Sequence, residues 1–345
     1  MKSGPTALDV AVLANVSQSA VSRTFTPGAS VSEKTKSKVL LAANKLGYRP
    51  NAIARSLSTN QSRIIALVMS YLENQFYPLV IEHLSQELQK QGYHVLLFIG
   101  QTNNFDADSI LLDILQYQVD GIVMASATLS PNLAKNCAAA GVPVVLFNRI
   151  SSISQSNLTS TSSVTTDNYK GGKMVAKTLV ERGYQKIAFI SGLENSSTSI
   201  QRENGLRDGL AEFNLAISFR SVGNYDFNQA KEATRELFRS KNRPDAIFVA
   251  NDHMAIATMD VIREELQLRI PEDIGIIGFD NIPQANWQSY QLTTMSQDVN
   301  QMVLATVGVL LNQIQHEIQP EHLVIPCEII ERNTLRKQLN TSLQE

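Results

Sequence analysis

Residues 6–26 read TALDVAVLANVSQSAVSRTFT, and this stretch decides the fold of the N-terminal part of the chain. Thr6 can cap a helix in which Asp9, three residues on, is placed as the acidic member of a capping box. Asn15, which tolerates the left-handed conformation, is expected to end that helix, and Ser17 to cap a second one over Gln18–Phe25. Two short helices joined by a tight turn form a helix-turn-helix. The small apolar residues at their contact are expected to be Val10, Ala14, Val16 and Val21.

A third helix should complete this N-terminal domain, with Ser32 as its cap and Gly47 as its stop. Its inner face is expected to present Thr35, Val39, Leu40, Ala43 and Leu46.

The second helix is the reader of a helix-turn-helix, because its N-terminal side chains reach base edges in the major groove. Gln can pair with adenine and Arg with guanine, whereas hydroxyls suit phosphates. A plain three-helix bundle that contacts no DNA is the alternative. The candidate DNA-binding residues of this domain are Thr6, Ser17, Gln18, Ser19, Ser22 and Arg23.

Charge is distributed unevenly along the 345 residues. Residues 1–63 carry nine Lys and Arg against two Asp and Glu, a net charge of +7, whereas the remainder carries −9. A small basic domain on an acidic body indicates a polyanionic partner that binds the N-terminal part. The length suits two or three domains.

From Arg63 onward, short apolar strands alternate with amphipathic helices. Strands expected include Ile64–Ser70, Gly121–Ala125 and Ala246–Ala250, and a second set is expected to start after the Ser/Thr-rich stretch Ser151–Ser163. This alternation predicts two doubly wound parallel-sheet lobes with a cleft between them, the shape of a periplasmic-type sugar-binding protein. Leu292–Gln297 and Leu323–Ile330 are expected to cross between the lobes.

Polar residues follow three of these strands, at Asn148-Arg149, Asn251-Asp252 and Asp280-Asn281. Ligands of such sheets lie at the carboxyl ends of the strands. Each pair alone is typical of a turn or a cap, but three at equivalent positions indicate a polar pocket for a hydroxyl-bearing ligand.

Several classes of protein are disfavoured. The longest apolar runs are of strand length and the N-terminus has no apolar signal region, so neither a membrane segment nor secretion is expected. Cys137 and Cys327 lie far apart, which fits a reducing cytoplasm. The five histidines lack metal-ligand spacing, and no phosphate-loop, dinucleotide or hydrolase motif stands at a strand–helix turn. We therefore expect no metal, no cofactor and no catalytic residue.

The N-terminal stretch resembles the lactose/galactose repressor (LacI/GalR) family of bacterial transcription regulators. Asn15, Ala20 and Thr26 depart from the family pattern, the last two near the phosphates. The resemblance rests on Thr6, Asp9-Val10-Ala11, Ala14, Val16-Ser17, Val21-Ser22-Arg23, Val31-Ser32, Thr35, Val39, Gly47-Tyr48, Pro50-Asn51 and Ala54-Arg55-Ser56-Leu57.

The resemblance implies that residues 51–62 form a hinge whose short helix folds only when two subunits lie together on DNA. An isolated helix of two turns is marginal in water. In the family the paired helices enter the minor groove and a leucine from each wedges open a base step. Asn51, Ala54, Arg55 and Leu57 are the candidate DNA-binding residues here, and a plain linker is the alternative.

The resemblance extends to about Arg332, on motifs such as Val164-Thr165-Thr166-Asp167-Asn168, Val249-Ala250-Asn251-Asp252 and Gly278-Phe279-Asp280. It implies domains at 1–50 (helix-turn-helix), 51–62 (hinge) and 63–345 (effector-binding core). The first lobe would span about 63–162 and 294–326, and the second about 163–293 and 327–336. The effector-binding residues carried over are Asn74, Phe76, Tyr77, Asn148, Arg202, Asn251 and Asp280.

The function that follows is a repressor in the bacterial cytoplasm. It would bind a pseudo-palindromic DNA operator as a homodimer, under the control of a small-molecule effector, a sugar or sugar derivative. Nucleosides and purines are less common effectors in the family. The short tail Asn333–Glu345 has no sustained heptad, so no tail-built tetramer is expected. Two rivals stay open, a binding protein whose N-terminal bundle contacts something other than DNA, and a carbohydrate-processing enzyme that uses the cleft.

Overall fold

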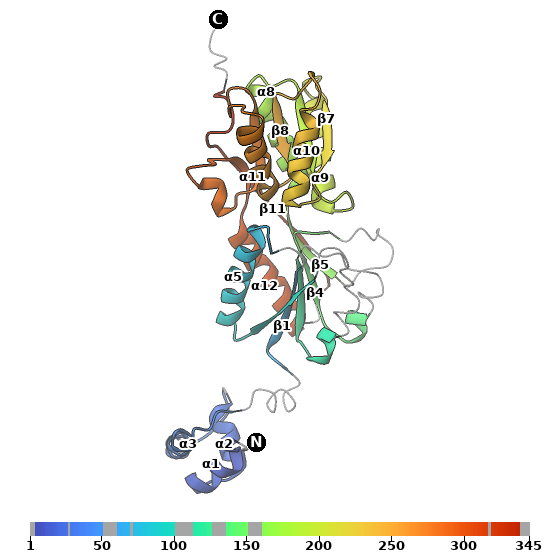
Figure 1. Ribbon diagram of the computed structural model, residues 1–345. Coiled ribbons are helices and arrows are strands. Elements are labelled where there is room, and N and C mark those ends of the chain that lie inside the picture. The colour runs from blue at the N-terminus through green and yellow to red at the C-terminus, as the bar shows by residue number, and fades with distance from the viewer. Residues whose placement is uncertain are drawn as a thin grey trace, which may run out of the picture. The chain divides into compact units, whose positions relative to one another are not determined.

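The computed structural model describes residues 4–26, 28–50, 61–69, 72–100, 113–125, 136–150, 161–316 and 319–338. The chain divides into two compact units, Met1–Ser62 and Arg63–Glu345 (Figure 1).

The N-terminal unit is built of helices whose ends are fixed by side chains. Thr6 caps the first helix and forms the expected capping box with Asp9, and Asn15 ends it in the left-handed conformation at φ 51°. Ser17 and Ser32 cap the next two helices, and Gly47 ends the third. These helices are α1 (Ala7–Ala14), α2 (Gln18–Phe25) and α3 (Glu33–Leu46).

The three helices enclose a small apolar core. The expected contact residues Val10, Ala14 and Val21 are buried in it, and Val16 packs against it. Leu40 was expected to face inward, but it is 41% exposed. Ala42 takes that place, because Val39, Ala42 and Leu46 recur at the spacing of one helix face and Leu40 lies about 100° around the helix from Val39.

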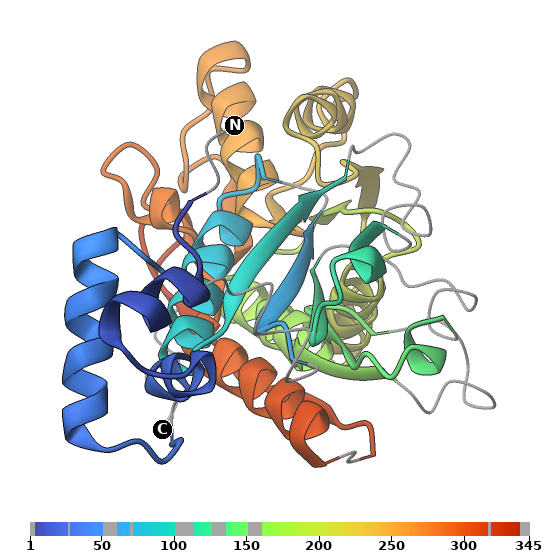
Figure 2. The same ribbon diagram turned by 90° about the horizontal axis from the view of Figure 1, so that it is seen from below.

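The first lobe of the larger unit is a six-stranded sheet whose strands are all parallel. Helices α5 (Phe76–Lys90) and α12 (Val299–His316) pack against each other and against this sheet (Figure 2). The strand order is β11 (His322–Ile325), β5 (Thr161–Thr166), β4 (Val144–Phe147), β3 (Gly121–Ala125), β1 (Ile64–Met69) and β2 (His94–Ile99).

The second lobe contains another six-stranded sheet, parallel except that β10 and β12 pair antiparallel. Its order is β12 (Cys327–Ile330), β10 (Thr293–Gln297), β9 (Gly275–Asp280), β8 (Ala246–Val249), β6 (Ile187–Ser191) and β7 (Phe219–Val222). Its helical elements are α8 (Asn168–Glu181), α9 (Ser197–Ala211), α10 (Phe227–Leu237), α11 (Asp252–Asp260), the π-helix η1 (Val261–Glu265) and the 3₁₀-helix η2 (Pro283–Asn286). Two lobes of mostly parallel sheet are the fold class that the sequence predicts.

The chain passes between the lobes after β5, after β10 and after β11. The last two crossings are the ones expected from sequence. The assignment of residues 294–297 to the first lobe was wrong, because β10 pairs with β9 and β12 of the second sheet. The second lobe likewise begins after Thr166 rather than near residue 163, because β5 pairs with β4 and β11.

Strand β5 corrects a second expectation. Its sequence, TSSVTT, continues the Ser/Thr-rich stretch that was expected to divide the lobes, yet every residue of the strand is buried. The hydroxyls are satisfied by specific partners. Ser162 Oγ accepts the Glu321 N–H at 3.0 Å, and Thr166 Oγ1 donates to Gln297 Oε1 at 2.7 Å. Burial of these groups is tolerable because they are hydrogen-bonded.

Helices α8 and α9 touch backbone to backbone through glycines. A Cβ on Gly205 would lie 2.0 Å from the carbonyl oxygen of Tyr169, and one on Gly172 would lie 2.3 Å from that of Arg202. Neither backbone atom can swing aside as a side chain could. The contact therefore fixes α9, and with it the position of Arg202.

Adding one methyl group at this contact should separate the helices. We expect Gly205→Ala to lower the free energy of unfolding by roughly 1–3 kcal/mol. Gly308 in α12 is the matched control, because a Cβ there meets no described atom within 4 Å. Gly308→Ala should instead stabilise the protein by roughly 0.5–1 kcal/mol. Urea unfolding of both variants measures this, and equal effects would contradict the packing argument.

The Asp252 carboxylate links the start of α11 by hydrogen bonds to β10 and to the segment that follows β9. Its Oδ1 accepts the Thr294 hydroxyl at 2.6 Å and its Oδ2 accepts the Ile282 N–H at 3.0 Å. Burial raises the pKa of Asp252 to about 7, and the nearby charge of Asp280 adds to the rise. The folded protein therefore holds this proton more tightly than the unfolded chain does.

The raised pKa gives stability a definite pH dependence. The contribution of Asp252 is fully present below its ordinary value of 3.8 and is lost as the pH rises through about 7. We expect the free energy of unfolding of the wild type, minus that of Asp252→Asn, to fall between about pH 4 and about pH 7 and to level off above that. Urea titrations across this range test it, and a difference that rises with pH would refute the assignment.

Candidate functional site

Helix α2 presents an exposed polar surface along its length. Gln18, Ser19, Ser22 and Arg23 are all exposed on it. Two other candidates serve as helix caps, since Thr6 Oγ1 donates to Asp9 Oδ2 and accepts the Asp9 N–H, and Ser17 Oγ accepts the Ala20 N–H. The hinge candidates Asn51, Ala54, Arg55 and Leu57 lie outside the described residues.

In the larger unit, one pocket brings together all seven residues predicted to bind the effector. Its empty space amounts to about 330 Å³ when the open solvent at its mouth is included. The residues come from segments far apart in the sequence, at the carboxyl ends of strands in both lobes. The pocket is lined by Asn74, Phe76, Tyr77, Asn148, Arg202, Asn251 and Asp280, together with Arg149, Thr198 and Tyr225.

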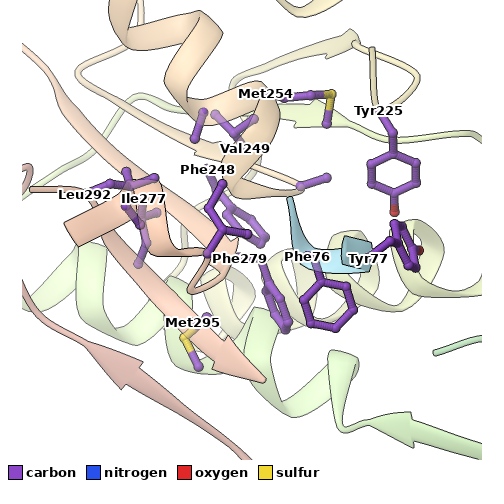
Figure 3. Packing of buried hydrophobic residues seen from close by; sticks show 14 of the residues in the cluster. Phe76, Tyr77, Tyr225, Phe248, Val249, Met254, Ile277, Phe279, Leu292 and Met295 are labelled. Atoms are coloured by element: carbon purple, nitrogen blue, oxygen red, sulfur yellow. The ribbon is translucent and has the colours of Figure 1, made fainter. Parts of the chain in front are cut away.

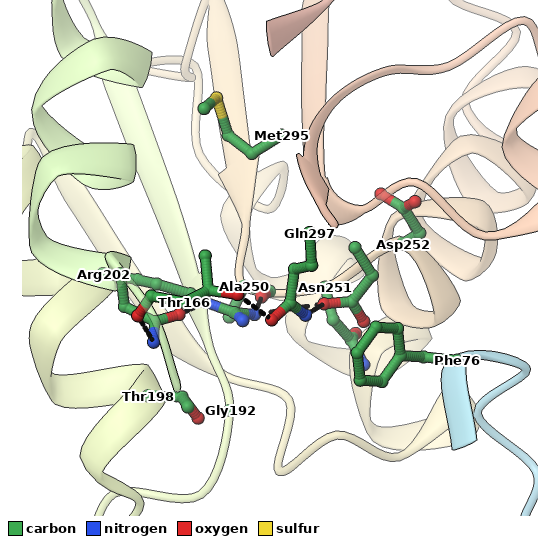
Figure 4. A network of polar contacts seen from close by, with 12 residues as sticks. Phe76, Thr166, Gly192, Thr198, Arg202, Ala250, Asn251, Asp252, Met295 and Gln297 are labelled. Carbon is green, nitrogen blue, oxygen red and sulfur yellow. Dashed lines mark hydrogen bonds and ion pairs between the residues drawn. The ribbon is translucent and has the colours of Figure 1, made fainter. Parts of the chain in front are cut away.

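Arg202 lies at the base of this pocket and is only 2% exposed. Its Nε donates to Asn168 Oδ1 at 2.8 Å and its Nη1 to the Ala250 carbonyl at 2.5 Å (Figure 4). Its Cζ lies 3.6 Å from the centre of the Phe279 ring, and Nη1 lies 3.6 Å from Asp280 Oδ1. A buried guanidinium is stable only with such partners.

Asp280 ends β9 with an unusual backbone, at φ 125°. Burial raises the pKa of its carboxyl to about 6, although Arg202 and a hydrogen bond from Gln297 favour the charged form. Gln297 Nε2 donates to Asp280 Oδ1 at 2.6 Å, and Gln297 Oε1 accepts the Thr166 hydroxyl. One side chain thus links β5 of the first lobe to the pocket carboxylate of the second.

Two amide atoms in the pocket are buried without a partner among the described residues. Asn251 Oδ1 caps α11 by accepting the Met254 N–H at 3.0 Å, and its Nδ2 donor remains unused. Asn148 Oδ1 is an unused acceptor, held by a residue at φ 55°. Leaving a buried polar group unpaired is costly. The two atoms offer one donor and one acceptor to a ligand.

Aromatic rings form the remaining surface of the pocket. The Phe76 ring lies 5.5 Å from that of Tyr77 and 6.4 Å from that of Phe147, centre to centre. Figure 3 shows Phe76 and Tyr77 beside Phe279 and Tyr225. An apolar surface with a few directed polar groups is typical of a small-molecule site.

Three pocket residues were not assigned from the sequence. Arg149 directly follows Asn148, and the strand-end pattern Asn148-Arg149 included it without naming it as an effector-binding residue. Thr198 precedes Arg202 by four residues on α9, so helical spacing places both on one face. Tyr225 lies in a turn after β7 at φ 59°, and no sequence signal points to it.

Within the described residues, no group of three or more His, Cys, Asp or Glu is arranged to hold a metal ion. No helix among those residues is long and apolar enough to cross a membrane.

Comparisons with known proteins agree on one family. Residues 6–51 match the family of bacterial regulatory proteins named lacI, and residues 176–335 match a periplasmic binding protein-like domain. The chain is 34% identical over 326 residues to the sucrose operon repressor of Streptococcus mutans serotype c, covering 93% of this chain and 97% of that protein. It is 31% identical over 333 residues to the repressor PurR of Vibrio atlanticus, covering 95% and 98%. These relatives are transcription repressors, not enzymes.

Solved structures give the same result. The lac repressor dimer bound to operator and the anti-inducer ONPF matches with a TM-score of 0.85 and 25% identity, over 97% of this chain and 100% of that one. A complex of the transcriptional regulator CelR with cellobiose matches with a TM-score of 0.72 and 26% identity, over 96% and 99%. With a helix-turn-helix in its N-terminal unit and a candidate pocket lined by both lobes of its larger unit, the chain belongs to the lacI family of bacterial transcription repressors.

Proposed function

We propose that this repressor binds a pseudo-palindromic operator as a homodimer and is controlled by a hydroxyl-bearing effector, a sugar or sugar derivative. The observation that supports a hydroxyl-bearing effector is the pair of unpartnered amide atoms, Asn148 Oδ1 and Asn251 Nδ2. A hydroxyl group can donate to the first and accept from the second. The names of the relatives support a sugar, since one is a sucrose operon repressor and one solved neighbour is a cellobiose complex.

The pocket also indicates how effector and DNA binding are coupled. Asn148 belongs to the first lobe, whereas Asn251 and Asp280 belong to the second. A ligand that contacts both lobes favours the arrangement in which they lie close together. If the two arrangements hold the hinges of a dimer differently, effector and operator affinities are coupled, typically by about 1–3 kcal/mol in each direction.

The homodimer follows from the reading surface. A single α2 presents few side chains to the major groove, and a two-fold symmetric pair doubles the contact with a symmetric operator. The lac repressor structure that this chain resembles is itself a dimer on operator.

Arg23 is the sharpest test of the reader helix. With an operator selected from random duplex DNA, we expect Arg23→Ala to weaken binding by roughly 1–3 kcal/mol per contact and to relax the preference at one base pair of each half-site. Lys45→Ala, at the exposed end of α3, is the control. It should weaken binding to all DNA sequences alike and reduce the salt dependence of binding, without changing the sequence preference. An Arg23→Ala protein that keeps full affinity and sequence preference would exclude α2 as the reader.

Asn251→Ser tests the pocket with little cost to the fold. Serine is as good an N-cap as asparagine, so the start of α11 is preserved, but the Nδ2 donor is lost. We expect effector affinity, measured by calorimetry with the sugar that shifts operator binding, to fall roughly 5- to 150-fold. A cooperative melting curve establishes that the variant is folded. Unchanged affinity in a folded variant would show that the effector binds elsewhere.

A further inference from the structure

Arg149 directly follows β4 and is only 5% exposed. Its Nη1 donates to the Asn148 carbonyl at 3.0 Å and to Thr198 Oγ1 at 2.7 Å. The Tyr225 ring centre lies 5.8 Å from its Cζ. All of these partners are neutral.

The other two arginines that are buried among the described residues show what is unusual about Arg149. Arg182 lies 2.8 Å from the carboxylate of Glu331, and Arg202 lies 3.6 Å from that of Asp280. No carboxylate of the described residues lies within ion-pair distance of Arg149. A buried charge is costly unless it is paired, so its environment as it stands is incomplete.

The hydrogen-bonding capacity of Arg149 is also incomplete. Both contacts use Nη1, and neither Nε nor Nη2 donates to a described residue. Nε and Nη2 form one edge of the guanidinium fork, the geometry that binds a phosphate or carboxylate with two parallel hydrogen bonds. Arg149 lines the pocket, so this edge is available to a bound molecule.

The charge of the described residues that line the pocket supports the same conclusion. The ten lining residues include two guanidinium groups and one carboxylate, Asp280, which already contacts Arg202 and Gln297. An empty pocket of this composition carries a net positive charge when Asp280 is ionised. A ligand with one negative group would restore neutrality.

We propose that the effector carries an anionic group, a phosphate or a carboxylate, that binds the free edge of Arg149. The inference rests on the proposed function and narrows it from a sugar to an anionic sugar derivative, such as a sugar phosphate or a sugar acid. The hydroxylated part of the molecule then contacts Asn148 and Asn251. Because Arg149 comes from the first lobe and its partner Thr198 from the second, the anion is bound where the lobes meet.

The first experiment tests the anion site without any sugar. Thermal unfolding of the full-length protein is followed in inorganic phosphate and in chloride at equal ionic strength. Three proteins are compared, the wild type, Arg149→Gln and Arg182→Gln, the last an equally buried arginine outside the pocket. We expect phosphate to raise the midpoint of the wild type and of Arg182→Gln more than that of Arg149→Gln. If phosphate raises the unfolding midpoint of all three proteins equally, the proposal is overturned. This holds even where Arg149→Gln is more stable than the wild type in chloride.

The second experiment tests whether the anion belongs to the effector. Calorimetry compares glucose with glucose 6-phosphate and glucuronate, ribose with ribose 5-phosphate, and sucrose with sucrose 6-phosphate. In at least one set we expect the anionic member to bind about tenfold or more tightly than its neutral parent. Arg149→Gln should abolish this preference, and Arg149→Lys should retain part of it.

The outcomes separate the two proposals. A neutral sugar that binds as tightly as its anionic derivative, with the same affinity in Arg149→Gln, overturns the anion and leaves the sugar effector standing. A phosphate effect that requires Arg149, in a protein that binds no sugar of either kind, supports the anion site and contradicts the sugar effector. Preference for the phosphate over the carboxylate, or the reverse, identifies the anion.

Discussion

A guanidinium group is always charged, and Arg202 places one in the interior of the second lobe. The constraint this imposes explains much of the site, because the partners of this group come from three different parts of the lobe. Asn168 opens α8, Ala250 directly follows β8, and Phe279 and Asp280 end β9. The carboxyl ends of the strands and the start of α8 are therefore held around one side chain. Arg202 is also one of the residues that line the candidate pocket.

The two lobes are joined by side-chain hydrogen bonds as well as by the three crossings of the chain. Gln297 lies at the second crossing and contacts Thr166, at the first crossing, and Asp280, in the pocket. A ligand that changes the position or charge of Asp280 therefore acts on the segment that links the lobes. Such a contiguous hydrogen-bonded path is a physical route for coupling, since its members cannot move independently without leaving buried groups unpaired.

Much of the fold and of the candidate site could be predicted from the sequence, because the interactions that decide them are local. Helix caps such as Thr6 and Asn15 act within a few residues, and strand ends such as Asn148 and Asp280 follow apolar runs that are easy to recognise. Strand β5 was not recognised, because its hydroxyls are paired by residues some 130 to 160 positions away. Tyr225 was missed for a similar reason, since only tertiary structure brings its turn to the pocket. The lobe boundaries were misplaced because strand pairing, not composition, decides which sheet a segment joins.

The glycine contact between α8 and α9 has a consequence for how ligand specificity can change. Since α9 cannot shift against α8, the positions of Arg202 and Thr198 are fixed. Any new ligand of this pocket would have to fit them. Asn148 and Arg149, which directly follow β4, and Phe76 and Tyr77, at the start of α5, belong to the first lobe and lie outside this glycine contact. A change of ligand specificity should therefore come more readily from the residues that the first lobe contributes to the pocket than from a movement of α9.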